Sequence, residues 1–195
     1  MPSTRSGRVS RVTKETKIEL SLQLDGGPID IQTSVTFLDH MLEAFAKHSG
    51  CGLQIAASGD GLDNHHVIED VGIALGKAMH EALGDKAGIA RFGSMMVPLD
   101  DALIAASVDL SGRSYLNFRV SFLKEQLGDL PTEMIGEFFR ALAENGRFNL
   151  HLVQMNGHVA HHVCEASFKA FARAFSMAKI RDAGMGVPST KGLLE

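Results

Sequence analysis

Two short segments, residues 65–69 and 161–165, share the pattern His-His-x-x-Glu, whose side chains can bind metal ions. The second copy begins 96 positions after the first (161 − 65). On a helix the first histidine and the glutamate share a face, whereas the second histidine points about 100° away. Each copy therefore offers ligands in two directions. Imidazole and carboxylate without thiolate favour Mn, Fe, Zn, Co or Ni over a purely structural zinc site.

A second repeat lies upstream of each motif and adds one candidate ligand to each half. His40 and Glu137 occupy equivalent positions in two shorter helix patterns, and both residue types bind borderline metals. The alternatives are that His40 is a capping or outer histidine and that Glu137 is a solvated glutamate. The duplication nominates eight ligands, enough for two sites of four: His40, His65, His66, Glu69, Glu137, His161, His162 and Glu165.

Several basic and hydroxyl side chains lie beside glycine or one another in a pattern that suits a phosphate group. They are Arg91, Arg113, Ser189 and Lys191. Such groups hold phosphate through charge-assisted hydrogen bonds, although a salt bridge or a surface charge is the simpler interpretation of each one alone. His48, at the predicted end of a helix, is compatible with both a structural and an active-site role.

Two carboxylates at repeat-equivalent positions are candidates for moving a proton. Glu15 and Asp101 each precede a run of residues with a strand pattern. Asp101 could equally belong to a turn that begins a strand. We take Glu15 as the first candidate for a catalytic base and Asp101 as the second.

An internal duplication supplies the elements that position these residues. Amphipathic helix patterns run through both motifs, and the two shorter helices are expected to end near Gly50 and Gly146. Each half thus consists of strands, a helix, a strand and a long helix. The second half needs about ten extra residues, and we place the insertion at the loop-like stretch 124–131. The strands predicted between and before these helices lie within residues 15–26, 53–56, 101–112 and 150–153.

We therefore expect an α+β fold built from a duplicated α/β half-domain. Two four-stranded sheets would enclose helices packed between them, so that the halves share one core. The first half is assigned to residues 1–90 and the second to residues 91–195, within one compact domain.

Length, charge and composition exclude several classes of protein. The 195 residues suffice for a substantial core, and 45% hydrophobic and 22% charged residues are ordinary for a globular protein. The net charge of −4 gives no reason to expect nucleic acid, and no apolar run approaches the ~20 residues of a membrane span. The N-terminus lacks the apolar core of a secretory signal. The two cysteines form no disulfide framework, so we expect a cytoplasmic protein.

The order of motifs from residue 14 to residue 194 resembles the imidazoleglycerol-phosphate dehydratase family. The first is Phe37-Leu38-Asp39-His40-Met41-Leu42, and the others are residues 65–76, 84–86, 91–93, 98–103, 109–113, 161–166, 168–174 and 189–192. The resemblance implies a hydro-lyase of histidine biosynthesis that converts D-erythro-imidazole-glycerol phosphate to imidazole-acetol phosphate. It also implies two Mn²⁺ per subunit and a homo-oligomer of 24 subunits with metal sites at subunit contacts.

The resemblance also implies roles for individual residues. The metal-ligand positions match His40, His65, His66, Glu69, His161, His162 and Glu165. The phosphate-binding positions match Arg91, Arg113, Ser189 and Lys191, and the substrate-contacting positions match Glu15 and His48. We assign the chemistry itself to Glu15, His40, His65, Glu69 and Glu165.

The chain departs from the family pattern at four positions. Glu137 stands where the family has a metal-ligand histidine, which adds negative charge and should favour harder ions such as Mn²⁺. Val159 replaces an asparagine, Ser34 a glycine, and Ala44 a glutamine that helps some members to bind phosphate.

Two other functions use the same ligands. A metal-dependent hydrolase would activate water toward an ester or amide, and turnover of imidazoleglycerol phosphate would distinguish the two reactions. A metal-storage shell would instead take up many ions. Ferritin-like bundles carry Glu-x-x-His on long helices, whereas this chain has His-x-x-x-Glu and predicted strands.

Overall fold

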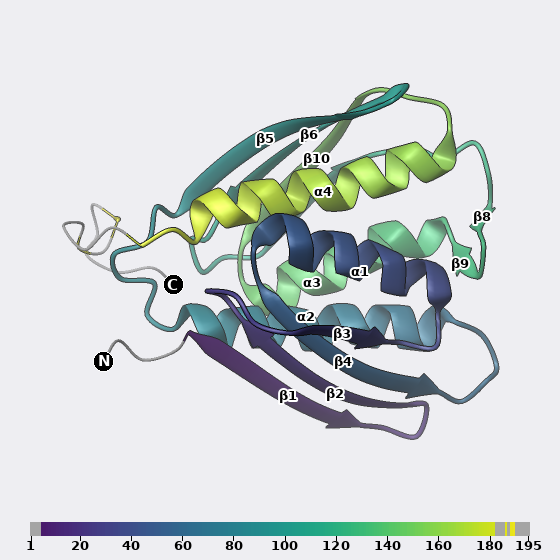
Figure 1. Cartoon of the computed structure of the whole chain (residues 1–195), viewed down its shortest axis with the longest axis horizontal. Helices are drawn as coiled ribbons and strands as arrows, with labels where there is room; N and C mark the ends of the chain where they lie inside the picture. Colours follow the sequence, from purple (N-terminus) through teal and green to yellow (C-terminus); the bar gives the residue numbers. More distant parts are fainter. Residues whose placement is uncertain (1–4, 182–185, 187, 190–195) are drawn as a thin grey trace.

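Two four-stranded sheets enclose four helices in the computed structural model, which describes residues 5–181, 186, 188 and 189 (Figure 1). The first sheet has the order β1-β2-β4-β3 and the second the order β5-β6-β10-β7. The strands of the first sheet are β1 (Ser6–Val12), β2 (Thr16–Gln23), β3 (Ile29–Gln32) and β4 (Gly52–Gly59). Those of the second are β5 (Phe92–Leu99), β6 (Ala102–Asp109), β7 (Tyr115–Arg119) and β10 (Asn149–Asn156).

The two halves repeat one topology. In each sheet the strand from the middle of the half runs parallel to its neighbour, β3 to β4 and β7 to β10, and the other pairs are antiparallel. This confirms the expected fold class, while the division at residues 90 and 91 stays a prediction. The helices are α1 (Thr36–Ser49), α2 (His65–Leu83), α3 (Glu133–Gly146) and α4 (Ala160–Ala178), and a hairpin is formed by β8 (Gln126–Leu127) and β9 (Leu130–Pro131).

Strand β2 shows how the sequence builds these layers. Ile18, Leu20 and Leu22 alternate along it, and each is at most 4% exposed. Lys17 and Glu19 between them are exposed, because successive side chains of a strand point to opposite faces of the sheet. Each buried aliphatic side chain contributes about 1.5–3 kcal/mol, which holds the sheet onto the helices.

Glycines end both helices of the first half, and the end of α1 at Gly50 confirms the prediction. Gly50 follows α1 with a φ of 69°, and its N–H bonds to the carbonyl of Ala46, which closes the last turn in the left-handed conformation that glycine favours. Gly84 follows α2 with a φ of 57°. Within the described residues, no helix is both long enough and apolar enough to span a membrane.

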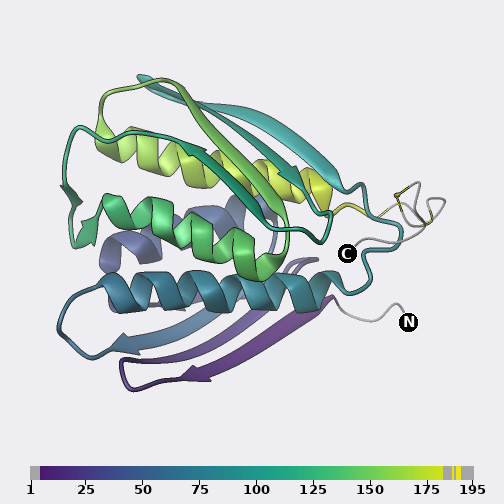
Figure 2. The same ribbon diagram turned by 180° about the vertical axis from the view of Figure 1, so that it is seen from behind.

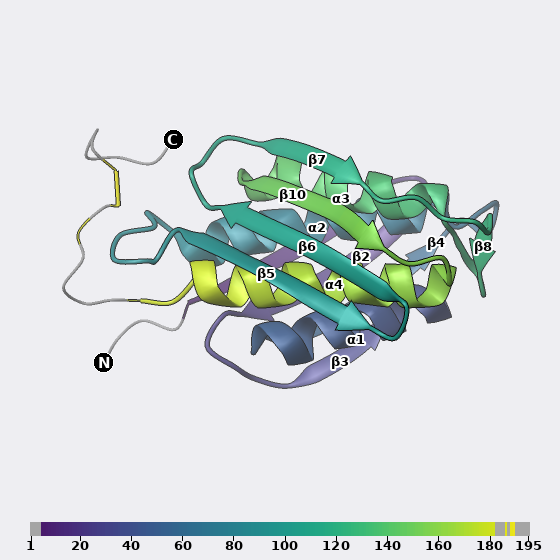
Figure 3. The same cartoon turned by 90° about the horizontal axis from the view of Figure 1, so that it is seen from above.

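Each long helix lies on the sheet of its own half but pairs with the short helix of the other half. Helix α2 packs on β1 and β2. Helix α4 packs on β5 and β6, which cross in front of it in Figure 3. In the middle layer, α1 lies beside α4 and α3 lies beside α2 (Figures 1 and 2). Side chains from the two halves therefore meet at both helix pairs.

The extra residues of the second half form the β8–β9 hairpin rather than a loop without regular structure. Its Asp129 carboxylate accepts hydrogen bonds from the N–H groups of Thr36 and Phe37, at 2.6 and 2.9 Å. These groups at a helix start have no partner within the helix. The Asp129 carbonyl accepts a further bond from Asn64 Nδ2, at 2.7 Å. The hairpin thus fixes the starts of α1 and α2, which carry candidate ligands.

Candidate active site

Helices α1 and α4 bring together three candidate ligands, His40, His161 and Glu165, here named the α1–α4 cluster. Glu165 Oε2 lies 3.2 Å from His161 Nε2 and 3.8 Å from His40 Nε2. One nitrogen or oxygen of each residue lies within 4.8 Å of the others, and no second group of three metal-binding side chains is this close in the described part of the chain. The cluster could hold a metal ion.

The other oxygen of Glu165 is held by a cation. Lys169, one turn further along α4, lies 2.7 Å from Glu165 Oε1. Burial raises the pKa of Glu165, but the hydrogen bond and charge of Lys169, helped by His40 and His161, outweigh it and bring the pKa below its ordinary value. Oε2 of an ionised carboxylate therefore faces the two imidazoles. The ring of Phe37 meets His161 edge-on at 5.2 Å, which restricts the imidazole.

Helices α2 and α3 carry the equivalent residues His65, Glu69 and Glu137, here named the α2–α3 cluster. His65 Nε2 lies 3.7 Å from Glu69 Oε2. Glu137 does not join them directly, because Arg140 lies between the two carboxylates. Its Nε is 2.6 Å from Glu137 Oε2 and its Nη2 is 2.8 Å from Glu69 Oε1. The two helix pairs thus carry similar metal-binding side chains, but at the α2–α3 cluster an arginine occupies the carboxylates.

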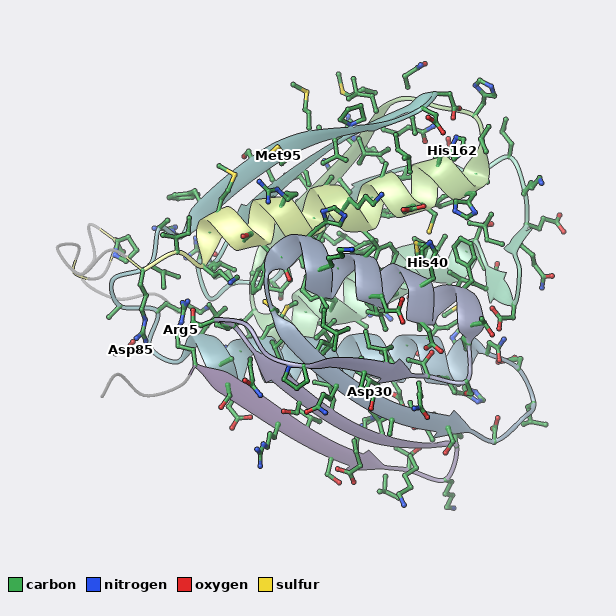
Figure 4. All side chains as sticks on the ribbon, in the orientation of Figure 1. Arg5, Asp30, His40, Asp85, Met95 and His162 are labelled. Carbon is green, nitrogen blue, oxygen red and sulfur yellow. The ribbon has the colours of Figure 1, made fainter. Side chains whose placement is uncertain are left out.

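The second histidine of each motif lies on another side of its helix and meets other carboxylates. His66 Nδ1 lies 3.1 Å from Asp60, and its Nε2 lies 4.0 Å from Glu15. Desolvation lowers the pKa of His66, but the charges of Glu15 and Asp60 outweigh it and raise the pKa. His162, labelled with His40 on the right-hand side of Figure 4, pairs through Nδ1 with Asp101 at 2.7 Å. His66 and His162 thus stand apart from the two clusters within this chain.

Asp101 and Glu15, the two candidate bases, have different surroundings. Asp101 Oδ2 accepts the N–H groups of His158 and Val159 at 2.7 and 3.0 Å, and Oδ1 meets His162. These bonds, led by those from the two backbone N–H groups, hold the pKa of Asp101 far below its ordinary value. Its carboxylate is therefore committed to fixing the start of α4, whereas the Glu15 side chain is 57% exposed.

Of the candidate phosphate-binding residues, Arg91 lies at the other end of α4. Arg91, with a φ of 68°, pairs with Asp109 at 2.7 Å and donates to the Pro188 carbonyl at 2.8 Å. Arg113 is exposed in the turn after β6. Ser189 is half-buried, and Lys191 lies outside the described residues.

Arg91 and the α1–α4 cluster do not meet within one chain. The Arg91 N–H bonds to the carbonyl of Ala178 at the end of α4, whereas His161 lies at its start. At 1.5 Å per residue the two ends are about 25 Å apart. His48 lies between them along the molecule, half-buried in the last turn of α1. Burial, followed by the charges of Lys169 and two further cations, lowers the pKa of His48.

Sequence reasoning missed four residues that surround the candidate ligands: Asp60, Asp129, Arg140 and Lys169. The repeat contains a signal for one of them. Arg140 aligns with Glu43, so a positive charge in one half stands where the other half has a negative one. The other three carry no such signal: the partners of Asp129 are distant in the sequence, Asp60 lies in the loop before α2, and Lys169 lies one turn away on an ordinary helix face.

Known proteins resemble the whole chain. The family model described as imidazoleglycerol-phosphate dehydratase matches residues 33–175. The imidazoleglycerol-phosphate dehydratase of Acidiphilium cryptum (strain JF-5) is 52% identical over 195 residues, covering 98% of this chain and all of its own. That of Desulforudis audaxviator (strain MP104C) is 53% identical over 192 residues, covering 97% and 98%. The crystal structure of the Staphylococcus aureus N315 enzyme superposes with a TM-score of 0.84 at 41% identity, covering 91% of this chain and 99% of that one.

The duplicated fold, the repeated histidine motif and these relatives define the class of protein: an enzyme, and within the enzymes a hydro-lyase. The chain belongs to the imidazoleglycerol-phosphate dehydratase family, a family of histidine biosynthesis. The resemblance found in the sequence is thereby confirmed, and the roles of the individual site residues stay predictions.

Proposed function

We propose that this chain catalyses the metal-dependent dehydration of D-erythro-imidazole-glycerol phosphate to imidazole-acetol phosphate. The observation that carries the proposal is the α1–α4 cluster, in which two imidazoles and an ionised carboxylate converge within 4.8 Å in a member of this family. The reaction removes a poorly acidic carbon-bound proton and a hydroxyl group, so it needs a base and an electrophile.

The metal is proposed to be Mn²⁺, with two ions per subunit. His40, His161 and Glu165 fit a borderline ion, since they combine nitrogen and oxygen donors without thiolate. Glu69, Glu137 and His65 fit a harder ion, once Arg140 has left the carboxylates. His66 and His162 are the remaining candidate ligands, available to sites shared between subunits. When bound, such ions supply Lewis-acid chemistry to the substrate.

Glu15 is proposed to remove the carbon-bound proton. Its carboxylate is exposed and lies 4.0 Å from His66 Nε2, so it stands beside a candidate ligand. Its backbone N–H bonds to Thr13 Oγ1 at 3.1 Å, which fixes the turn that carries it. Asp101 is unsuited to this role, because its bonds to two backbone N–H groups favour the ionised form and leave it a very weak base.

Arg91, Arg113, Ser189 and Lys191 are proposed to hold the substrate phosphate, with His48 as a further contact. Because Arg91 lies about 25 Å from His161 along α4, one small substrate could not span both in a single chain. This supports a homo-oligomer, proposed to have 24 subunits, in which neighbouring copies complete each site. We also propose that the enzyme acts in the cytoplasm.

Metal-stripped full-length protein would test the proposal. Turnover of imidazoleglycerol phosphate is measured with and without added Mn²⁺, while bound metal is counted. Product formation that returns only with Mn²⁺, at two ions per chain, is the expected result. The variant His161→Ala should retain less metal and no turnover. Two bound ions without product would contradict the proposed reaction.

A further inference from the structure

Arg140 binds three carboxylates at once. Its Nε lies 2.6 Å from Glu137, its Nη1 3.1 Å from Glu144 and its Nη2 2.8 Å from Glu69. Two of these belong to α3, where residues three and four apart are neighbours, and Glu69 belongs to α2. Glu69 and Glu137 are candidate metal ligands, whereas Glu144 is not. The guanidinium therefore occupies carboxylate oxygens that a metal ion would need.

Close packing of α2 on α3 brings Arg140 within reach of Glu69. Gly72 lies one turn after Glu69, and a Cβ on it would come 2.8 Å from the backbone carbonyl oxygen of Phe138. Only glycine permits this approach of the two backbones. Its repeat counterpart on α4 is Phe168, which packs against Phe138 at 5.4 Å between ring centroids. The bridge across the α2–α3 pair thus depends on a contact that the α1–α4 pair does not repeat.

The other half of the repeat offers an internal comparison. Glu137 corresponds to His40, and Arg140 corresponds to Glu43, which is exposed. At the α1–α4 cluster the nearby cation is Lys169, which contacts one oxygen of Glu165 alone. Its presence leaves Glu165 Oε2 facing both imidazoles. The cation at the α2–α3 cluster holds two ligand residues, and the cation at the α1–α4 cluster holds one.

We propose that Arg140 is a built-in competitor for metal at the α2–α3 cluster, so that the two metal sites are unequal and fill in order, the α1–α4 site first. The guanidinium and a metal ion are alternative occupants between Glu69 and Glu137. Binding of the second ion moves Arg140 away from both carboxylates. This inference rests on the metal-dependent function proposed above and concerns the affinity of the sites rather than the reaction.

The test is a titration of metal-stripped full-length protein with Mn²⁺, in which free Mn²⁺ is followed by electron paramagnetic resonance. The wild type should show two classes of site whose affinities differ by about tenfold or more. Arg140→Gln should tighten the weaker class by roughly twofold to fivefold, because the partly exposed ion pairs that compete with the metal contribute about 1 kcal/mol at most, and it should leave the tighter class unchanged. Glu137→His, which frees one ligand from Arg140 and supplies an imidazole, should bring the two classes together.

Three further variants control the experiment. Glu144→Gln removes a partner of Arg140 that is not a candidate ligand, so both classes should keep their affinity. His65→Ala should delete the weaker class and His161→Ala the tighter one. Thermal unfolding of Arg140→Gln, whose side chain is 45% exposed, checks that the fold is retained.

Two equal classes of site in the wild type, or an unchanged affinity of the weaker class in Arg140→Gln, would overturn the inference. If two ions per chain were still bound in that case, the proposed metal-dependent function would stand. Absence of Mn²⁺ binding in every variant would overturn both. A weaker class that loses affinity in Arg140→Gln would also refute competition, because it would mean that Arg140 supports the metal rather than excluding it.

Discussion

The α1–α4 and α2–α3 helix pairs stand at equivalent places in a duplicated fold, yet their polar side chains differ. At the first pair, two imidazoles face a carboxylate whose far oxygen is held by Lys169. At the second, a glutamate replaces one imidazole and Arg140 bridges the carboxylates. The strands around them have not diverged in the same way, since both pairs lie between sheets of one topology. The duplication therefore preserves positions while allowing the charge at each site to change.

The turns before β2 and β6 show the same separation of roles. Glu15 is exposed beside His66, whereas Asp101 accepts two backbone N–H groups ahead of α4. Of these equivalent carboxylates, Asp101 places a helix, whereas Glu15 is the proposed catalytic base. Substitution of Glu15 should therefore change turnover, whereas substitution of Asp101 should change stability.

The largest expected effect is that of Glu15→Gln on turnover. Loss of a catalytic base should lower kcat about 10²- to 10⁴-fold, while the thermal midpoint stays unchanged because the side chain is exposed and has no strong partner. Steady-state kinetics on imidazoleglycerol phosphate with Mn²⁺ would measure it. Glu19→Gln, the same change on an exposed position of β2, is the matched control and should retain full turnover. Full activity in Glu15→Gln would remove Glu15 from the role.

The next largest effect is expected at two glycines that allow a strand to lie against the long helix in both halves. Gly7 and Gly93 are equivalent positions on β1 and β5, and a Cβ would lie 2.1 Å from the Ala78 carbonyl oxygen and 1.9 Å from that of Ala174. Each strand therefore lies directly against its long helix. Gly7→Ala and Gly93→Ala should each lower the free energy of unfolding by about 2–4 kcal/mol, measured in urea at fixed protein concentration.

Gly136→Ala on α3 is the control for these glycines. Its added Cβ would meet only Phe118, at 3.5 Å, and alanine favours a helix by up to about 1 kcal/mol over glycine. Neutral or slightly higher stability is expected there. If Gly7→Ala or Gly93→Ala behaved like Gly136→Ala, the close approach of that strand to its helix would be refuted.

The fold could be predicted from the sequence because its signals are local and repeated. The alternation of Ile18, Leu20 and Leu22 and the helical period after each histidine motif depend on neighbours along the chain. The site could be predicted only as a set of residue types. The pairing of α1 with α4 is set by packing of the whole core, so His40 could not be matched to His161 in advance. The hold of Arg140 on Glu69 likewise joins positions 71 apart.

A smaller effect is expected at Asp101, and it depends on pH. Asp101→Asn keeps an acceptor but loses the charge that faces the N–H groups of His158 and Val159 and the ring of His162. The thermal midpoint should fall by about 2–4 °C at pH 7. The folded-state pKa of Asp101 lies below the unfolded value of about 3.9. The contribution of the Asp101 carboxylate to stability is therefore complete above the unfolded-state pKa and is lost as the pH falls toward the lower folded-state pKa.

Thermal unfolding of wild type and Asp101→Asn from pH 7 to pH 3 would measure this. The difference between them should stay constant above about pH 5 and narrow below about pH 4. Glu15→Gln provides the control from the other half, with no difference from wild type. A difference for Asp101→Asn that does not narrow in acid would contradict the charged bonds as its cause.

The smallest expected effect is the difference in stability between substitutions of Lys169 and of Arg140 in the metal-free protein. Lys169 pairs with Glu165 within one helix, and such pairs contribute about 0.2–0.5 kcal/mol. Arg140 joins α3 to α2 as well as to its own helix, so Arg140→Gln should cost more than Lys169→Gln, though about 1 kcal/mol at most for partly exposed pairs. Urea unfolding without metal should show that order in the free energy of unfolding.

Saturating Mn²⁺ should then reduce the loss of unfolding free energy in Arg140→Gln, because the bound ion replaces Arg140 between Glu69 and Glu137. If the loss of unfolding free energy were the same with Mn²⁺, the Arg140 guanidinium would still contact its carboxylates when metal is bound. The two helix pairs would then differ in charge but not in the order in which they bind metal.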